Sequence, residues 1–256
     1  MTTARTEDYW MEHSNVRVPP LLGARDVHVW RIQLDAAHNV DALRMLLPPE
    51  EQTRANRFVN AGHTRRFIVT YGVMRQILAG YLGALATDLR FGVGDHGKPF
   101  LDVPNLSAQK LEFNLSHSGS VALLAIARGR AVGVDVEEWD ERVQHLAVSE
   151  RFFSPVERDA LRTLDTNGRV LDGFFATWSR KEAYLKATGR GITRGLHHFD
   201  VSVHPDAPAL LIADRLDADA LSRWTMRALA PRRGYSGAVV VESPLRTLLL
   251  FEATVS

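Results

Sequence analysis

The 256-residue sequence contains no cysteine, which excludes disulfides and cysteine-ligated zinc. It also has no run of about 18 apolar residues, so no membrane span and no membrane partner are expected. The first twenty residues mix charges of both signs and lack the apolar stretch of a secretory signal. The expected location is the cytoplasm.

An excess of one charge is missing as well, because 31 lysine and arginine residues stand against 30 aspartate and glutamate residues. A bulk nucleic-acid binder is normally strongly basic, so no nucleic-acid partner is expected, while a local basic pocket for a phosphorylated small molecule stays open. Lysine itself is scarce. Its only positions are Lys98, Lys110, Lys181 and Lys186, so each is a candidate for a place that needs a compact ammonium group.

Helical and strand patterns are both present, and 45% hydrophobic residues are enough for a sizeable core. Apolar spacing and turn residues predict helices over 64–81, 145–153, 155–164 and 170–188, with an earlier helix beginning at Pro48–Glu51. Strands are predicted over 26–35, 89–93, 111–115, 121–127, 131–136, 199–204, 210–213, 225–230, 237–242 and 247–253.

A faint internal repeat suggests two similar parts. Phe67-x-x-Thr70-Tyr71 in one long helix resembles Phe174-x-x-Thr177-Trp178 in another. We therefore expect an α+β protein with a loose N-terminal lead-in over 1–24, an N-terminal α+β half over 25–132 and a C-terminal α+β half over 133–256.

The segment Gly133-Val134-Asp135-Val136-Glu137 carries the strongest chemical signal. Side chains alternate along a strand, so Asp135 and Glu137 point to one face and the two valines point to the other, into a core. Two carboxylates on one face suit Mg²⁺, which prefers oxygen ligands. A solvated strand end with alternating acids would show the same pattern.

A second signal lies in the helix around Trp178, Glu182 and Lys186, which share one face at spacings of four residues. Glu182 is a candidate third carboxylate for a metal, and Lys186 is a candidate for neutralising phosphate. Lys181 points elsewhere, toward a substrate in this interpretation. The alternative is an ordinary Glu-to-Lys pair on a helix surface.

Two loops add weaker signals. The run from Phe113 to Gly119 contains Ser116 and His117, whose polar groups suit a phosphate, although the same residues stabilise turns. Gly97-Lys98-Pro99 follows an Asp95-His96 turn and suits a phosphate or a base edge, or is simply a surface loop.

Four arginines on the early helices are candidates for gripping an anion, although arginine is common throughout the chain: Arg54, Arg57, Arg65 and Arg66.

Taken in order, GKP, FNLSHSG, GVDVE and FFATWSRKEAYLKATGRGI resemble the signature of the Sfp-type 4'-phosphopantetheinyl transferases. The resemblance runs from about residue 47 to residue 200. It implies a pseudo-twofold α+β monomer that binds coenzyme A between its halves. The implied reaction transfers the 4'-phosphopantetheine arm of coenzyme A to a serine of an apo acyl or peptidyl carrier protein, with release of adenosine 3',5'-bisphosphate.

The same resemblance implies roles for individual residues. Asp135, Glu137 and Glu182 would be the ligands of Mg²⁺, with Mn²⁺ as the alternative metal, and Glu182 would be the general base, directly or through a metal-bound water. Lys186 would contact the diphosphate and take part in catalysis. Coenzyme A would also meet these residues: Arg54, Arg66, Gly97, Lys98, Pro99, Ser116 and His117. Glu51 departs from relatives that have lysine there, which puts one phosphate contact in doubt.

The expected partner is a small acidic helical carrier domain of peptide, polyketide or fatty-acid synthesis, which places the chain in secondary metabolite biosynthesis or a related pathway. Arg151, Phe152 and Phe153 are candidates for docking it, or they are helix core and solvated charge. Two rival functions remain at this stage: a Mg²⁺-dependent phosphohydrolase acting on a nucleotide, and a non-catalytic coenzyme A-binding module.

Overall fold

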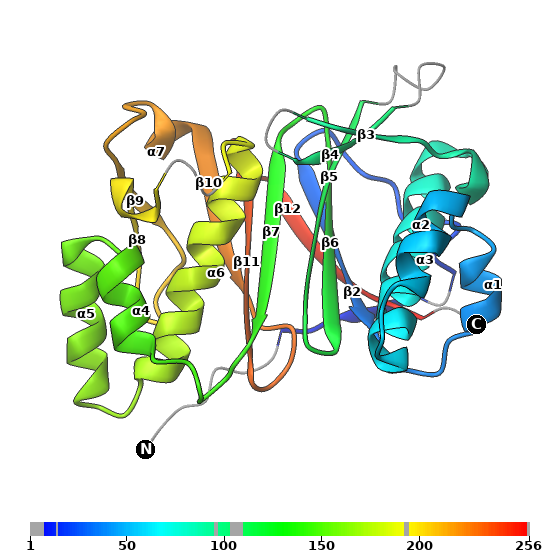
Figure 1. The fold of residues 1–256 in the computed structure, drawn as a ribbon. Coiled ribbons are helices and arrows are strands. Elements are labelled where there is room, and N and C mark those ends of the chain that lie inside the picture. The colour runs from blue at the N-terminus through cyan, green and yellow to red at the C-terminus, as the bar shows by residue number, and fades with distance from the viewer. Residues whose placement is uncertain (1–7, 14, 95–96, 103–109, 192–194, 255–256) are drawn as a thin grey trace.

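The computed structural model describes residues 8–13, 15–94, 97–102, 110–191 and 195–254. Most of its strands lie in the middle of the molecule and its long helices on two outer flanks, with β8 (Phe199–Val201) and β9 (Leu211–Asp214) beside α4 (His145–Phe152) and α5 (Pro155–Asp165) (Figure 1). The predicted α+β class is therefore confirmed. Within these residues, no helix has both the length and the apolar character that crossing a membrane requires.

The larger sheet has five strands, in the order β1 (Met11–His13), β12 (Thr247–Ala253), β2 (Asp26–Gln33), β6 (Val121–Arg128) and β5 (Leu111–Ser118). β12 runs parallel to β1 and β2, and the other neighbours are antiparallel. Alternation along β2 sends Trp30 and Ile32 into one core and Val27 and Val29 into another. This sheet is therefore covered on both faces.

Helices α1 (Val40–Arg44), α2 (Pro49–Asn56) and α3 (Ala61–Leu82) cover the outer face of the larger sheet (Figure 1). The predicted long helix was expected from residue 64, but α3 begins three residues earlier. The reason is that the Asn60 side chain accepts a hydrogen bond from the N–H of Gly62 and caps the first turn. α3 ends at Gly83, whose φ of 63° is the left-handed conformation that stops helices.

The smaller sheet has three antiparallel strands, in the order β10 (Trp224–Leu229), β11 (Tyr235–Glu242) and β7 (Val132–Glu138). Helix α6 (Val170–Thr188) lies across its outer face and ends, like α3, at a left-handed glycine, Gly189. The resemblance between the two long helices noted in the sequence thus corresponds to two helices that each cover one sheet.

Shorter elements complete the fold, and most were predicted. The exceptions are η1, β4, η4 and α7, and β8 ends three residues earlier than expected. The remaining elements are the short helix η1 (Ala86–Asp88), β3 (Phe91–Val93), β4 (Pro99–Leu101), α4 (His145–Phe152), α5 (Pro155–Asp165), the short helix η4 (Leu196–His198), β8 (Phe199–Val201), β9 (Leu211–Asp214) and α7 (Ala220–Arg223).

The inner faces of the two sheets pack together through a valine-rich core that includes Val134 and Val136. β5 and β7 meet along this seam, and polar side chains of β5 reach across it. Asn114 Oδ1 accepts a hydrogen bond from the backbone N–H of Val134 at 2.8 Å, and Ser118 Oγ donates to Glu137 Oε2 at 3.1 Å. The seam therefore holds polar groups of both sheets at fixed positions.

Two expectations about chain organisation were wrong. The lead-in over 1–24 is not loose where it is described, because β1 pairs with β12 and Trp10, Val16 and Leu22 are buried. The final strand β12 does not stay with the C-terminal half, since it lies between β1 and β2 in the larger sheet. The N-terminal sheet is thus built from both ends of the chain. The division of the halves at residue 132 remains a prediction.

Candidate active site

The acidic strand has the alternation that its sequence predicts. Val134 and Val136 of β7 are buried between the sheets. Asp135 and Glu137 point to the opposite face, where α6 packs, and Asp135 is only 2% exposed. A carboxylate buried to this extent requires hydrogen bonds and a positive partner, because a bare charge is costly away from water.

Helix α6 supplies that partner. Lys186 Nζ lies 2.5 Å from Asp135 Oδ1 and 2.9 Å from Ser116 Oγ, and Ser116 Oγ itself donates to Asp135 Oδ1 at 2.9 Å. Three elements, β5, β7 and α6, therefore meet at one carboxylate.

Gly133 makes this meeting possible. A Cβ atom at this position would lie 2.2 Å from the backbone oxygen of Ala183 and 2.3 Å from the backbone nitrogen of Ala187. No side chain fits between strand and helix at that separation, so glycine lets α6 lie directly on β7. The first residue of the acidic motif thus positions the residues that α6 carries.

The three acids of the site influence one another. Burial, followed by the nearby charges of Asp135 and Glu182, raises the pKa of Glu137 to about 7, although Ser118 and Lys186 act in the opposite direction. Burial and then the Asp135 charge raise the pKa of Glu182. Burial also raises the pKa of Asp135, with Lys186 and Ser116 opposing it. The charges of these carboxylates therefore act on one another.

The donor set fits a divalent cation in two respects. Asp135 Oδ2 and Glu182 Oε1 are buried and have no hydrogen-bond partner. In addition, three carboxylates and one ammonium leave two negative charges, which one divalent ion would balance. Within the described residues, however, no three His, Asp or Glu side chains form a group that could hold a metal ion. The three-carboxylate ligand set remains a prediction.

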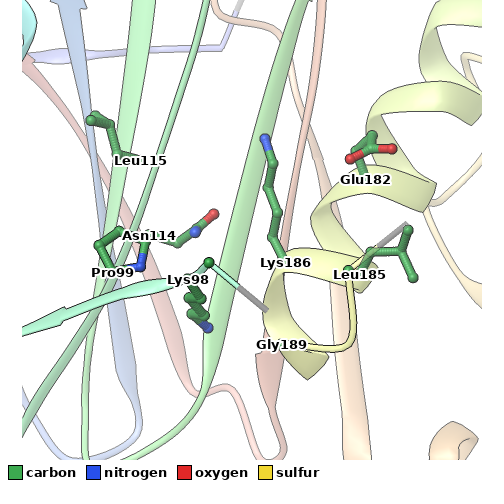
Figure 2. A pocket seen from close by; sticks show the side chains of 10 residues that line it. Lys98, Pro99, Asn114, Leu115, Glu182, Leu185, Lys186 and Gly189 are labelled. Carbon is green, nitrogen blue, oxygen red and sulfur yellow. The ribbon is translucent and has the colours of Figure 1, made fainter. Parts of the chain in front are cut away.

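A cavity of about 220 Å³ opens beside this cluster. Figure 2 shows Glu182 and Lys186 on α6 at one side of it, and Asn114 and Lys98 at the other. Its lining joins two segments that are far apart in sequence, the 97–99 loop and the end of α6. The lining residues are Gly97, Lys98, Pro99, Asn114, Leu115, Glu182, Leu185, Lys186, Gly189 and Gly191.

Lys98 enters the cavity from the opposite side to Lys186. Its Nζ donates to the backbone oxygen of Val132 at 2.9 Å, so the loop is tied to the start of β7. Burial lowers the pKa of Lys98, while the charge of Glu112 opposes that shift. The Asp95-His96 turn that precedes this loop lies outside the described residues.

His117 follows Ser116 on β5, so its side chain lies on the other face of the strand, where it is exposed. Burial first, and then the positive charges of Lys186 and Arg54, lower the pKa of His117. Both cations therefore lie within electrostatic range of His117. Arg54 is exposed and stacks over the Phe67 ring at 5.3 Å.

The guanidinium group of Arg66 is paired with the carboxylate of Asp35. It makes a two-armed ion pair with Asp35, with nitrogen–oxygen distances of 2.8 and 2.6 Å. Its phosphate-binding role remains a prediction that requires this pair to rearrange.

Glu51, the position where the family resemblance left one phosphate contact in doubt, accepts hydrogen bonds from the Arg75 guanidinium at 2.8 and 3.2 Å. Its carboxylate thus neutralises an arginine whose side chain is only 3% exposed.

Two other interpretations were wrong. Lys181 does not point toward a substrate, because its side chain is fully buried and its Nζ lies 2.8 Å from Glu157 Oε1. The same ammonium donates to the backbone oxygens of Leu196 and Phe199. Phe153 is 2% exposed and stacks on Phe174, so it is core rather than docking surface.

Sequence reasoning missed the bridging role of Asn114 and the cavity positions of Leu115, Leu185, Gly189 and Gly191. Asn114 carried a usable signal. It stands two residues before Ser116, and both side chains face the same side because β5 continues to Ser118, beyond the predicted end at residue 115. The glycines stood directly after the helix that carries Glu182 and Lys186, at the point where a helix end approaches a loop.

A buried acid held by a lysine and a serine lies next to a cavity with a second lysine, an arrangement that suits an anionic ligand. Comparisons with known proteins specify the class. Residues 35–128 match a family model described as 4'-phosphopantetheinyl transferase, N-terminal, and residues 131–240 match one described as the 4'-phosphopantetheinyl transferase superfamily.

Individual relatives agree. The chain is 36% identical over 234 residues to the 4'-phosphopantetheinyl transferase HetI of Nostoc sp., covering 90% of this chain and 94% of the relative. It is 29% identical over 161 residues to the 4'-phosphopantetheinyl transferase Sfp of Bacillus subtilis, covering 62% and 68% of the two chains. The chain belongs to the 4'-phosphopantetheinyl transferase family and is an enzyme of that class.

Proposed function

We propose that this enzyme takes the 4'-phosphopantetheine arm from coenzyme A and attaches it to a serine of an apo acyl or peptidyl carrier protein. Adenosine 3',5'-bisphosphate is the other product. The observation that carries this proposal is the Asp135–Lys186–Ser116 cluster beside the cavity that contains Lys98. Acids, cations and a cavity occur together here, as transfer of a phosphoryl-linked group from a polyanion requires.

Coenzyme A carries its charge on a diphosphate and a 3'-phosphate. We assign its nucleotide end to Gly97, Lys98 and Pro99, and its diphosphate region to Ser116, His117 and Lys186. We assign binding of the 3'-phosphate to Arg54 and Arg66. Support for this assignment comes from the cavity lining and from the charges of Arg54 and Lys186, both of which act on His117.

Asp135, Glu137 and Glu182 would hold Mg²⁺, or Mn²⁺ in its place, and the bound ion would withdraw charge from the diphosphate. The chain's own residues account for the remaining chemistry. Lys186 carries a positive charge toward the phosphates, and Ser116 holds both Lys186 and Asp135 in place. The charge of Lys186 opposes the negative charge that develops on the leaving diphosphate oxygen.

Glu182 is the base in this proposal. The hydroxyl oxygen of the carrier serine bonds to the phosphorus that bears the pantetheine arm, and the bond to the oxygen of adenosine 3',5'-bisphosphate breaks. Glu182 accepts the hydroxyl proton, because an unassisted serine hydroxyl is a poor nucleophile near neutral pH. Burial raises the pKa of Glu182, which makes it a better proton acceptor than an exposed carboxylate.

Mass spectrometry tests the reaction. A panel of apo carrier proteins is incubated with the enzyme, coenzyme A and Mg²⁺, and each carrier should gain the mass of one phosphopantetheine. The gain should disappear with EDTA and with a carrier whose acceptor serine is alanine. Release of inorganic phosphate without a mass gain would instead indicate a phosphohydrolase. We also propose that the enzyme acts as a monomer in the cytoplasm, which light scattering and fractionation would test.

A further inference from the structure

A second, larger cavity of about 580 Å³ lies on the C-terminal half, away from the residues that line the first. It is formed by the first turns of α6, the hairpin between β10 and β11, and the chain just beyond β7. The residues that matter for its chemistry are Trp139, Arg169, Leu171, Leu229, Arg232 and Tyr235.

The two cavities lie at opposite ends of β7. At one end, Val132 accepts a hydrogen bond from Lys98, a lining residue of the first cavity. At the other end, the Tyr235 hydroxyl donates to Glu138 at 2.7 Å, and Trp139 Nε1 donates to Ser236 Oγ at 2.9 Å; Trp139, Tyr235 and Ser236 all line the second cavity.

The predicted metal carboxylates lie between these ends. Asp135 is in the middle of β7, and Glu137 is directly opposite Ser236 on β11. In phosphoryl transfer the attacking and leaving oxygens are roughly in line. If the nucleotide leaves on the side of the first cavity, the acceptor hydroxyl has to approach from the other side, and the second cavity lies at that end of β7.

The second cavity combines an apolar floor with a positive rim. Its floor includes Leu171, Leu229 and Ala230. Arg169 is neutralised by ion pairs with both acids of the lining, Asp172 and Asp206.

Arg232, by contrast, is exposed, and its side chain donates to the neutral hydroxyl of Ser120 at 3.2 Å. The rim therefore offers a positive charge beside apolar surface, and the complementary partner face is acidic and apolar.

We propose that this second cavity, with Arg232 on its rim, docks an acidic amphipathic face of the carrier protein and presents the acceptor serine to the acids of β7. The proposal rests on the proposed transfer reaction and names the surface that the acceptor uses. Of the docking residues expected from the sequence, only Phe153 is buried; Arg151 is exposed and Phe152 is partly exposed, so their docking role remains a prediction.

The test reverses the charge of Arg232 and, as a control, the charge of Arg25, an exposed arginine just before β2. Arg232 lies within electrostatic range of Asp35, which follows β2, whereas Arg25 is exposed just before β2 begins. R232E should raise the KM for the apo carrier about tenfold, with kcat and the KM for coenzyme A unchanged. R25E should leave all three constants unchanged.

A charge-swap experiment gives a second readout. Acidic residues on the carrier surface are changed to lysine one at a time, and at least one such carrier should regain its affinity with R232E while losing it with the wild-type enzyme. Equal carrier KM values for R232E, R25E and wild type would overturn the docking proposal. Failure of the reaction itself would look different, because the wild-type enzyme would then modify no carrier at all.

Discussion

Lys186 Nζ lies 2.5 Å from Asp135 Oδ1, so the lysine predicted to meet phosphate is paired with an acid predicted to meet metal. The two side chains differ in exposure, at 29% for Lys186 and 3% for Asp135. The ammonium can turn toward water or a ligand, whereas the carboxylate cannot. Lys186, which pairs with Oδ1, and a divalent cation at the unpartnered Oδ2 would therefore compete for the negative charge of the same carboxylate.

This competition predicts the behaviour of K186M without coenzyme A. The variant leaves Asp135 buried without its positive partner, so it should lose about 2 kcal/mol of unfolding free energy, a moderate value because Lys186 is partly solvated. Mg²⁺ should restore much of this loss and bind more tightly than to the wild type. Urea unfolding with and without Mg²⁺, together with Mn²⁺ titration calorimetry, measures both effects. Equal metal affinities in the two proteins would contradict the competition.

The E182Q variant tests the base. Glutamine keeps the size of the side chain but cannot accept the serine proton, so kcat should fall by on the order of 10²- to 10⁴-fold while the unfolding midpoint changes little. E150Q, at an exposed helix position, is the matched control and should keep full activity. Normal transfer by E182Q would show that another group takes the proton.

Several parts of the site were predictable from sequence because they depend on local periodicity. Alternation on a strand places Asp135 and Glu137 on one face, and helical spacing places Glu182 and Lys186 together. The contact between Lys186 and Asp135 is different, since it depends on how closely α6 approaches β7 across 51 residues of chain. The periodicity of a sequence carries no information about the distance between a helix and a strand. In the structure this distance follows from Gly133, where a Cβ atom would collide with the backbone of α6.

The same reasoning explains the errors. Lys181 is next to Glu182 in sequence, and no local signal says whether such a lysine faces water or a buried acid. Its partner Glu157 belongs to another helix, where it also closes a capping box with Ser154. The placement of β12 between β1 and β2 likewise depends on pairing between the two ends of the chain, which the alternation of a single strand does not specify.

Glu137 predicts a pH dependence. Its pKa is raised to about 7, so the folded protein holds this proton at pH values where an unfolded carboxyl group has lost it. In the metal-free protein, the protonated Glu137 side chain therefore contributes to the free energy of unfolding. This contribution is fully present below the ordinary glutamate pKa and is lost as the pH rises to about 7. Affinity for Mg²⁺ should increase over the same range, because the metal requires the ionised form.

Urea unfolding and metal titration between pH 5 and pH 8 would measure these two trends, which should run in opposite directions. E137Q removes the titrating group and should flatten both profiles, while E141Q, at an exposed position nearby, should preserve them. A profile of E137Q that matches the wild type would assign the pH dependence to another group.

The close approach of α6 to β7 predicts the effect of G133A. An added methyl group would lie 2.2 Å from a backbone oxygen of α6, and backbone atoms cannot turn aside as a flexible side chain can. The helix must shift, which should cost about 3 kcal/mol of stability and move Glu182 and Lys186 relative to Asp135. Activity at a temperature where G133A is still folded should therefore fall at least tenfold, because positioning errors of about 1 Å slow transfer strongly. Wild-type kcat in a destabilised but folded G133A enzyme would mean that the separation of strand and helix does not control the site.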